Sequence, residues 1–204
     1  MSVVTENPQN EQLRRVFNVP NQLTILRLIL SLVTFGLISW QRYLAALVVF
    51  LIAAGTDWMD GYYARKYGQV TVLGRILDPF VDKIIICGSF IFLGSLEGSG
   101  VRAWMAVVVV GRELLVTALR SFLEQQGADF SATWSGKVKM VLQCAAVAVS
   151  LYALSLPHQN LIPSAPWLLA ALPAVVWSAV VMTVYSGVAY IVAAARLLRP
   201  EASG

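Results

Sequence analysis

The sequence predicts an all-α membrane protein in which six transmembrane helices form a single domain. Hydrophobic residues make up 58% of the 204 residues and charged residues 13%, about half of the roughly 25% found in ordinary globular proteins. The mean hydropathy is +0.70. The apolar residues gather in six runs that approach the roughly 20 residues needed to cross a bilayer. This composition excludes a disordered chain, a disulfide scaffold and a typical water-soluble enzyme.

The first element along the chain is a polar segment, residues 1–19, which we expect on the cytoplasmic surface of the membrane. A disordered tail is an equal alternative for its first ten residues. It lacks the short apolar core and the small-residue cleavage site of a signal peptide. The membrane domain covers residues 20–199, and residues 200–204 form a short tail. The six predicted spans are 23–40, 43–65, 73–95, 102–124, 137–156 and 167–198. Each must be helical, because an isolated strand leaves its backbone groups unsatisfied in lipid.

The ends of the predicted spans carry aromatic residues typical of a membrane interface. Four tryptophans lie there: Trp40, Trp104, Trp134 and Trp167. Pro166 and Pro173 interrupt the start of the sixth span, so we expect an interfacial piece before the main helix. Both cysteines, Cys87 and Cys144, lie in apolar runs and indicate buried thiols rather than a disulfide framework.

The distribution of basic residues predicts the orientation of the spans. With both termini inside, the outer connections hold only Arg42, Arg102 and His158. The inner side holds the other basic residues of the span ends: Arg14, Arg15, Arg65, Lys66, Arg75, Lys137, Lys139, Arg196 and Arg199. The positive-inside rule therefore places both termini in the cytoplasm. In so apolar a chain, a net charge of +4 indicates membrane flanks or anionic substrates and not nucleic acid.

Four aspartates stand out in this apolar sequence. Asp57 and Asp60 lie near the end of the second span, and Asp78 and Asp82 lie near the start of the third. Steps of three and four residues turn an α-helix by about 300° and 400°, so each pair shares one helical face. A short loop joins the two spans on the cytoplasmic side. Antiparallel packing would bring all four carboxylates to a common point.

Such a cluster requires a compensating interaction. Each aspartate within the membrane costs roughly 2.5–3.5 kcal/mol on an insertion scale, before mutual repulsion is counted. Protonation of most of the four is one solution. Two divalent cations are another, because they balance four negative charges, and oxygen ligands suit Mg²⁺ or Mn²⁺. The structural alternative is pairing with the nearby bases, which are Arg65, Lys66, Arg75 and Lys83. We favour metal or proton chemistry over this alternative.

A second set of charges lies in the fourth and fifth spans. Its members are Arg112, Glu113, Arg120, Lys137 and Lys139. Arg112 and Arg120 are eight residues apart and therefore lie close to one face of a helix. A basic pocket on the cytoplasmic side, near the depth of the aspartates, indicates a place for a second, anionic substrate. The alternative is that Arg112 only pairs with Glu113 or with a lipid headgroup.

The segment that carries the aspartates resembles a known family signature. Residues 57–82 read D-W-M-D-G-Y-Y-A-R-K-Y-G-Q-V-T-V-L-G-R-I-L-D-P-F-V-D. They satisfy the pattern D-x2-D-G-x2-A-R-x8-G-x3-D-x3-D of the CDP-alcohol phosphatidyltransferase family without a gap. Residues 20–24, with Arg27, are similar to the start of that family's first span. Eight fixed positions at fixed spacing in two adjacent spans make this a specific match.

Shorter segments resemble the branch of the family that makes phosphatidylglycerophosphate in bacteria. The segment L-D-P-F-V-D-K is one of them. The others are Gly111-Arg112-Glu113, the segment G-K-V-K together with Gln143, and Tyr185-Ser186-Gly187. Met140 departs from this branch, which commonly has Thr after the second Lys.

The resemblance implies an enzyme of a bacterial cytoplasmic membrane, with its active site facing the cytoplasm and a homodimeric assembly. CDP-diacylglycerol would donate its phosphatidyl group to the 1-hydroxyl of sn-glycerol 3-phosphate and release CMP. Two divalent cations, Mg²⁺ or Mn²⁺, would bind at the aspartates. Asp57 and Asp78 would bridge both ions, Asp60 would complete one site and Asp82 the other.

The resemblance also implies roles for residues beyond these carboxylates. Asp82 is the candidate general base for the acceptor hydroxyl. The expected contacts to CDP-diacylglycerol are Asn21, Thr24, Gly61, Arg65, Thr71 and Gly74. The expected contacts to the acceptor phosphate are Arg112, Arg120, Lys137 and Lys139.

Two alternatives remain open at the level of sequence. The same chemistry could use another acceptor, namely inositol phosphate, serine or phosphatidylglycerol. The basic residues of spans four and five favour a phosphorylated acceptor over serine. An ion or proton transporter is the alternative from another class, and it predicts acidic groups spread across the membrane depth. Here all four aspartates gather on one side.

Overall fold

The structure is a computed structural model that describes residues 19–67, 72–125, 134–156 and 166–197. For residues 19–21, 23, 57–67, 72–79, 82, 124, 135 and 197 it describes the backbone alone. Parts of the predicted chain lie outside these ranges, namely residues 1–18 of the amino-terminal segment, Thr71, His158 and the tail at 200–204.

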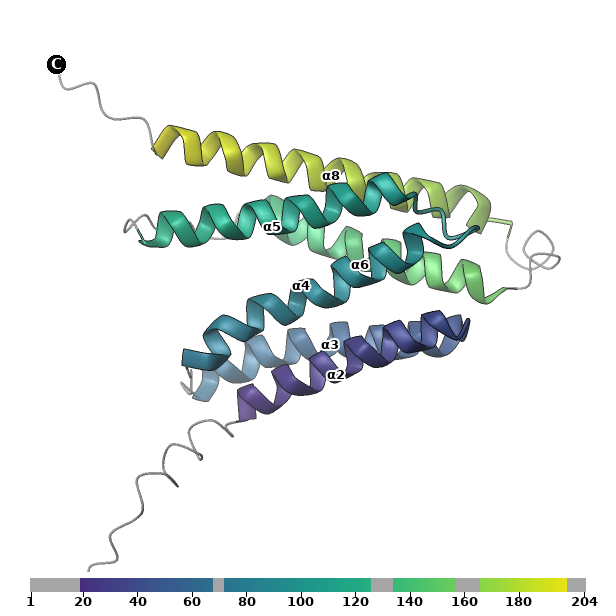
Figure 1. The fold of residues 1–204 in the computed structure, drawn as a ribbon, viewed down its shortest axis with the longest axis horizontal. Coiled ribbons are helices and arrows are strands. Elements are labelled where there is room, and N and C mark those ends of the chain that lie inside the picture. Colours follow the sequence, from purple (N-terminus) through teal and green to yellow (C-terminus); the bar gives the residue numbers. More distant parts are fainter. Residues whose placement is uncertain (1–18, 68–71, 126–133, 157–165, 198–204) are drawn as a thin grey trace, which may run out of the picture. The chain divides into compact units, whose positions relative to one another are not determined.

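The described chain is all α-helical, as the sequence predicts. Its helices are α2 (Val19–Ser39), α3 (Tyr43–Tyr67), α4 (Val72–Gly94), α5 (Ala103–Gln125), α6 (Trp134–Ser155) and α8 (Leu168–Leu197) (Figure 1). Each corresponds to one of the six predicted spans, and the bounds differ by a few residues. The apolar runs therefore predicted where each helix lies, and the polar linkers predicted where each ends.

The chain forms two compact units, residues 1–85 and 86–204, and the boundary falls within α4. In the first unit, α2 and α3 pack together as a hairpin. Gln41 ends α2 in the left-handed conformation, with φ 58°. The Arg42 amide donates to the Leu37 carbonyl at 2.8 Å, and the Gln41 amide donates to Ile38 at 2.9 Å. These bonds satisfy the last carbonyls of α2 and allow α3 to begin at once.

Helix α2 has the reverse of the amphipathic pattern of a soluble helix. Its buried face carries polar side chains, namely Thr24, Arg27, Ser31 and Thr34. Its exposed face carries large apolar side chains, namely Ile25, Leu26, Ile29, Leu32 and Val33. Ser31 and Thr34 donate to backbone carbonyls one turn earlier, at 2.8 Å each. A helix that turns its polar face inward and its apolar face outward suits lipid surroundings, not water.

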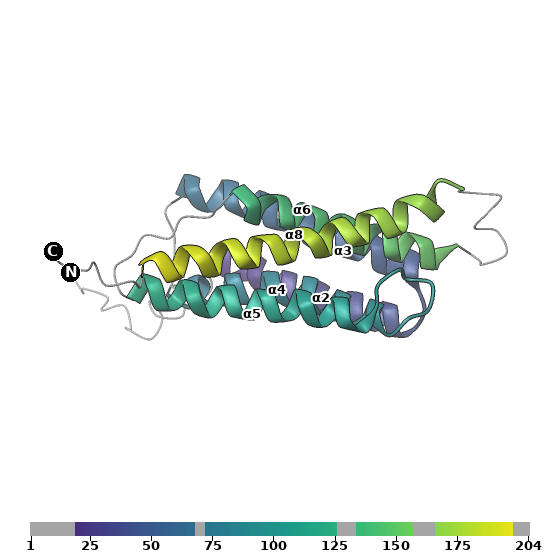
Figure 2. The same cartoon turned by 90° about the horizontal axis from the view of Figure 1, so that it is seen from above.

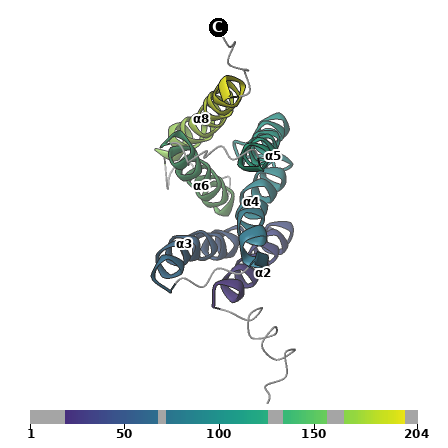
Figure 3. The same cartoon turned by 90° about the vertical axis from the view of Figure 1, so that its left-hand side faces the viewer.

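In the second unit, α8 packs along both α5 and α6 (Figures 2 and 3). Several of the fully buried positions in these helices are Ala or Val. Their short side chains let the helices approach closely. These positions include Val109 on α5, Ala146 and Val147 on α6, and Val176 and Ala179 on α8. This packing brings the polar residues of the three helices to a shared interior.

The start of α8 corrects one expectation from the sequence. Pro173 does not interrupt the helix, because it lies inside α8, which begins at Leu168. Proline in the second turn removes only the amide that would donate to the Leu169 carbonyl. The first turn is held by the Leu169 amide, which donates to Pro166, and the Ala171 amide, which donates to Trp167.

Within the described residues, two helices are long and apolar enough to cross a membrane: Gly136–Ser155 of α6 and Leu168–Arg196 of α8. Shorter apolar stretches occur at Thr24–Ser39, Tyr43–Thr56 and Lys83–Gly94. All four tryptophans expected at an interface are exposed near helix ends. These features, together with the inverted pattern of α2, indicate a membrane protein, and a count of six spans stays a prediction.

Candidate active site

The aspartate motif lies on two consecutive helices of the first unit. Asp57 and Asp60 are in α3, and Asp78 and Asp82 are in α4. Because both segments are α-helical, each pair has the one-turn spacing that places two carboxylates on the same face. Only residues 68–71 connect α3 to α4. The helical backbone thus agrees with the predicted spacing, while the antiparallel packing of α3 and α4 and the meeting of the four side chains stay predictions.

The donor set of this motif fits a pair of hard divalent cations. Four carboxylates supply only oxygen ligands and four negative charges, which suits Mg²⁺ or Mn²⁺. Among the side chains that the structure describes, no group of three His, Cys, Asp or Glu could hold a metal ion. The four aspartate side chains are not in that set, so their chemistry and helical spacing carry the argument.

The residues expected to contact CDP-diacylglycerol lie mainly in the same two helices. Gly61 and Arg65 are in α3 and Gly74 is in α4, while Asn21 is in the first turn of α2. Thr24 is the one whose side chain the structure describes, and it is 3% exposed on the polar face of α2. Its neighbour on that face, one turn along, is Arg27.

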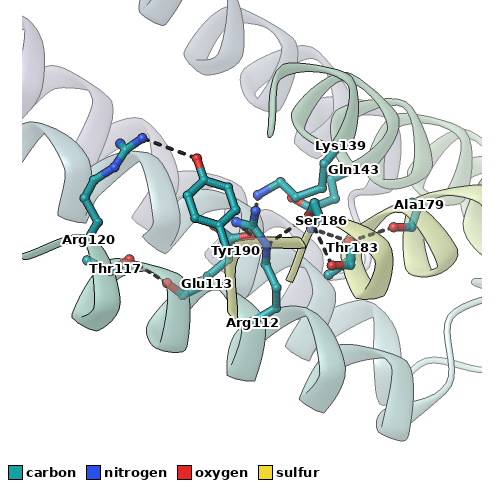
Figure 4. A network of polar contacts seen from close by, with 10 residues as sticks. All are labelled: Arg112, Glu113, Thr117, Arg120, Lys139, Gln143, Ala179, Thr183, Ser186 and Tyr190. Carbon is teal, nitrogen blue, oxygen red and sulfur yellow. Dashed lines mark hydrogen bonds and ion pairs between the residues drawn. The ribbon is translucent and has the colours of Figure 1, made fainter. Parts of the chain in front are cut away.

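A second polar site lies inside the unit formed by α5, α6 and α8 (Figure 4). Glu113 on α5 is its only acidic member, and its carboxylate forms ion pairs with two cations. The Lys139 ammonium of α6 donates to Glu113 Oε1, and Arg112 Nη1 donates to the same oxygen at 3.3 Å. Glu113 and Lys139 are 5% and 6% exposed. The pairing of Arg112 with Glu113, weighed above as an alternative, is therefore present within a larger network.

Helix α8 supplies partners to both arginines of α5. Arg112 Nε donates to Ser186 Oγ at 3.2 Å, and its guanidinium carbon lies 5.5 Å from the centre of the Tyr190 ring. Arg120 Nη2 donates to the Tyr190 hydroxyl at 3.4 Å. Two arginines that are two turns apart on α5 therefore meet one tyrosine of α8 (Figure 4).

Further hydrogen bonds fix α6 and α8 around this site. Gln143 Nε2 donates to Thr183 Oγ1 at 2.9 Å, and Thr183 donates to the Ala179 carbonyl at 2.6 Å. Ser186 donates to the Thr183 carbonyl at 3.1 Å. These residues are buried, so their hydrogen bonds resist exchange with water and hold the helices in register.

The network gathers three of the four residues predicted to bind the acceptor phosphate. Arg112, Arg120 and Lys139 belong to it, whereas Lys137 is exposed on another face of α6. The described hydrogen bonds of Arg112 use Nε and Nη1, so its Nη2 group is left to donate to a ligand oxygen. Arg112 and Lys139 both pair with the one carboxylate of Glu113, so one positive charge is in excess there, which suits an anionic ligand.

Sequence reasoning did not assign a role to the α8 members of this network. Thr183, Ser186 and Tyr190 follow steps of three and four residues and therefore share one helical face. That spacing was one available signal, beside the resemblance of Tyr185-Ser186-Gly187 to a branch of the family. It is weak, because Ser and Thr in a membrane helix often bond only to their own backbone.

Comparison with known proteins identifies the family of this chain. The model of the CDP-alcohol phosphatidyltransferase family matches residues 17–185. The chain belongs to this family. The match covers the aspartate motif and the cationic residues of α5 and α6, whereas Ser186 and Tyr190 of this CDP-alcohol phosphatidyltransferase lie just beyond it.

Individual relatives of this CDP-alcohol phosphatidyltransferase carry a more specific description. A CDP-diacylglycerol–glycerol-3-phosphate 3-phosphatidyltransferase of Bacillus subtilis strain 168 is 36% identical over 190 residues, which cover 86% of this chain and 94% of the relative. The protein of the same description from Escherichia coli strain K12 is 33% identical over 184 residues, 87% of this chain and 95% of the relative.

Proposed function

We propose that the chain transfers the phosphatidyl group of CDP-diacylglycerol to sn-glycerol 3-phosphate, giving phosphatidylglycerophosphate and CMP. The observation that carries this proposal is the cationic cluster at Glu113, where Arg112 and the buried Lys139 share one carboxylate oxygen. Two cations beside one carboxylate leave a positive charge in excess, which suits a phosphate monoester, the carrier of about two negative charges at neutral pH. Serine and a phosphodiester lipid do not offer that charge. The descriptions of the relatives support the same acceptor.

The donor site is assigned to the aspartate motif. Asp57, Asp60, Asp78 and Asp82 would hold two divalent cations, Mg²⁺ or Mn²⁺. When bound, these cations would neutralise the diphosphate and the CMP leaving group. The contacts to cytidine and phosphate would come from Asn21, Thr24, Gly61, Arg65, Thr71 and Gly74. Arg65 would offer a planar fork of donors suited to phosphate oxygens.

In the transfer step, Asp82 would accept the proton of the acceptor's 1-hydroxyl. The hydroxyl oxygen then bonds to the phosphorus that carries diacylglycerol, and the bond from that phosphorus to the CMP oxygen breaks. Because a carboxylate is a weak base, Asp82 acts chiefly by being held close to the hydroxyl. Arg112, Arg120 and Lys139 would hold the acceptor by its phosphate, and the exposed Lys137 would draw the anion from water.

The membrane setting completes the proposal. The chain would cross the cytoplasmic membrane of a bacterium six times, with both termini and the active site on the cytoplasmic side. That placement lets a water-soluble acceptor and a two-tailed donor reach one site. The family resemblance supports a homodimer.

An assay of acceptors tests the proposed function. The purified protein, with CDP-diacylglycerol and Mg²⁺ in mixed micelles, is offered sn-glycerol 3-phosphate, inositol phosphate, serine or phosphatidylglycerol. We expect rapid CMP release and a phosphatidylglycerophosphate product with the first acceptor, because the network suits a phosphate monoester and the descriptions of the relatives favour glycerol 3-phosphate over inositol phosphate. Preference for another acceptor contradicts the assignment. Divalent-ion uptake into liposomes without any CMP release would instead favour a transporter.

Removal of divalent cations should abolish the activity. After treatment with a chelator, CMP release should fall to the background rate, because four uncompensated carboxylates repel the diphosphate of the donor. Mg²⁺ or Mn²⁺ should restore it, and Na⁺ at the same ionic strength should not. Full activity in the presence of the chelator would contradict the assignment of the aspartates to metal binding.

A further inference from the structure

One face of α8 contacts both arginines of the network. Ser186, Gly187 and Tyr190 lie on this face and are buried. They follow directly after residue 185, where the match to the family model ends. Nothing in the proposed chemistry requires these residues to touch a substrate, yet each of them contacts an arginine that is assigned to the acceptor.

Ser186 and Gly187 both contact the side chain of Arg112. The Ser186 hydroxyl accepts the Arg112 Nε hydrogen at 3.2 Å. A Cβ atom added at Gly187 would lie 3.1 Å from Arg112 Cγ, closer than ordinary van der Waals contact. The aliphatic stem of Arg112 therefore crosses α8 where the helix has no side chain. A methyl group at this position would push the guanidinium away from its partners.

Tyr190 fixes the spacing between the two arginines. Its ring lies 5.5 Å from the Arg112 guanidinium carbon, within the range of a cation–π interaction. Its hydroxyl accepts a hydrogen bond from Arg120 Nη2 at 3.4 Å. Arg112 and Arg120 start about 12 Å apart along the α5 axis, at 1.5 Å per residue. Tyr190 contacts both long side chains and so limits the rotamers that they can sample.

We propose that Ser186, Gly187 and Tyr190 are positioning residues for the acceptor site. By restraining Arg112 and Arg120 before the acceptor arrives, they reduce the conformational entropy lost when a phosphate monoester binds. This inference rests on the proposed function, because it takes the network to be the acceptor site. It adds that acceptor affinity depends on side chains of α8 that do not touch the acceptor.

Two substitutions at Tyr190 separate its two contacts. Tyr190→Phe keeps the ring beside Arg112 and removes the hydroxyl that receives Arg120, so the KM for sn-glycerol 3-phosphate should rise about tenfold. Tyr190→Leu removes both contacts and should raise this KM further. Gly187→Ala should act on Arg112 alone. In each variant the KM for CDP-diacylglycerol should stay unchanged. Tyr185→Phe, which removes the hydroxyl of an exposed tyrosine on the same helix, is the matched control.

Inorganic phosphate provides a readout that does not depend on turnover. It should inhibit the wild type in competition with the acceptor, and the inhibition constant should rise in the Tyr190 variants by the same factor as the acceptor KM. An unchanged KM for the acceptor in both Tyr190 variants overturns the inference. Equal increases of KM for both substrates, or a fall in thermal stability with unchanged KM, also overturn it, because they indicate a purely structural role.

The same experiment separates this inference from the proposed function. If the acceptor assay identifies an alcohol other than sn-glycerol 3-phosphate, the proposed function fails, and the variants are then measured with that alcohol. A selective rise in its KM supports the positioning role, and no rise overturns it.

Discussion

Replacement of Asp82 by Asn should lower kcat by about a thousandfold, within the range that general-base catalysis contributes. The amide keeps the shape of the side chain but cannot accept the proton of the acceptor hydroxyl. CDP-diacylglycerol should still bind, because three carboxylates remain on α3 and α4 for the cations. The measurements are single-turnover CMP release and equilibrium binding of the donor to the purified variant.

Asp60→Asn is the companion variant that distinguishes a base from a ligand. Both residues are assigned to one cation each, but only Asp82 is assigned the proton transfer. Raising the Mn²⁺ concentration should therefore restore much of the kcat of Asp60→Asn and little of that of Asp82→Asn. Glu97→Gln, at an exposed carboxylate outside the helices, should match the wild type. Equal rescue of both aspartate variants by Mn²⁺ would assign Asp82 to metal binding alone.

Replacement of Glu113 by Gln should destabilise the protein by about 3 kcal/mol, because it leaves the buried Lys139 and the partly buried Arg112 without their counterion. The Arg112 guanidinium and the Lys139 ammonium both pair with this carboxylate, and their repulsion is uncompensated once the charge is gone. The midpoint of thermal unfolding in detergent micelles, converted to a free energy of unfolding, measures the effect. We also expect the acceptor KM to change, since the two cations are then free to move apart.

A double variant separates charge from packing at this site. Glu113→Gln combined with Lys139→Met removes one cation together with the carboxylate, so it should be more stable than the sum of the two single changes predicts. Glu97→Gln again serves as the control and should alter the free energy of unfolding by less than about 0.5 kcal/mol. A fully additive double variant would show that Glu113 and Lys139 do not stabilise one another.

The helices and the aspartate motif were predictable from the sequence because both depend on local periodicity. An apolar run bounded by polar linkers specifies a membrane helix, and aspartates at steps of three and four residues specify a shared face. Arg112, Arg120 and Lys139 were also identified, because a charge in an apolar helix stands out. Their assignment to the acceptor is a proposal that the observed network supports.

The partners of these cations could not be predicted in the same way. Which oxygen Arg112 meets depends on how α5 packs against α8, and contacts such as Arg112 to Ser186 and Arg120 to Tyr190 join residues far apart in sequence. The prediction that Pro173 interrupts the start of the sixth span was also wrong. Proline early in a helix removes one hydrogen bond, and the rest of α8 supplies enough of them to continue.

The inverted amphipathic pattern of α2 has a consequence for protein engineering. The buried hydroxyl groups of Ser31 and Thr34 already donate to the carbonyls of Arg27 and Leu30. A water-soluble redesign of this helix therefore needs no change at these buried hydroxyl groups. Substitution of the outward-facing Ile25, Leu26, Ile29, Leu32 and Val33 by glutamate, lysine or other polar residues would convert its lipid-compatible exterior into an aqueous one.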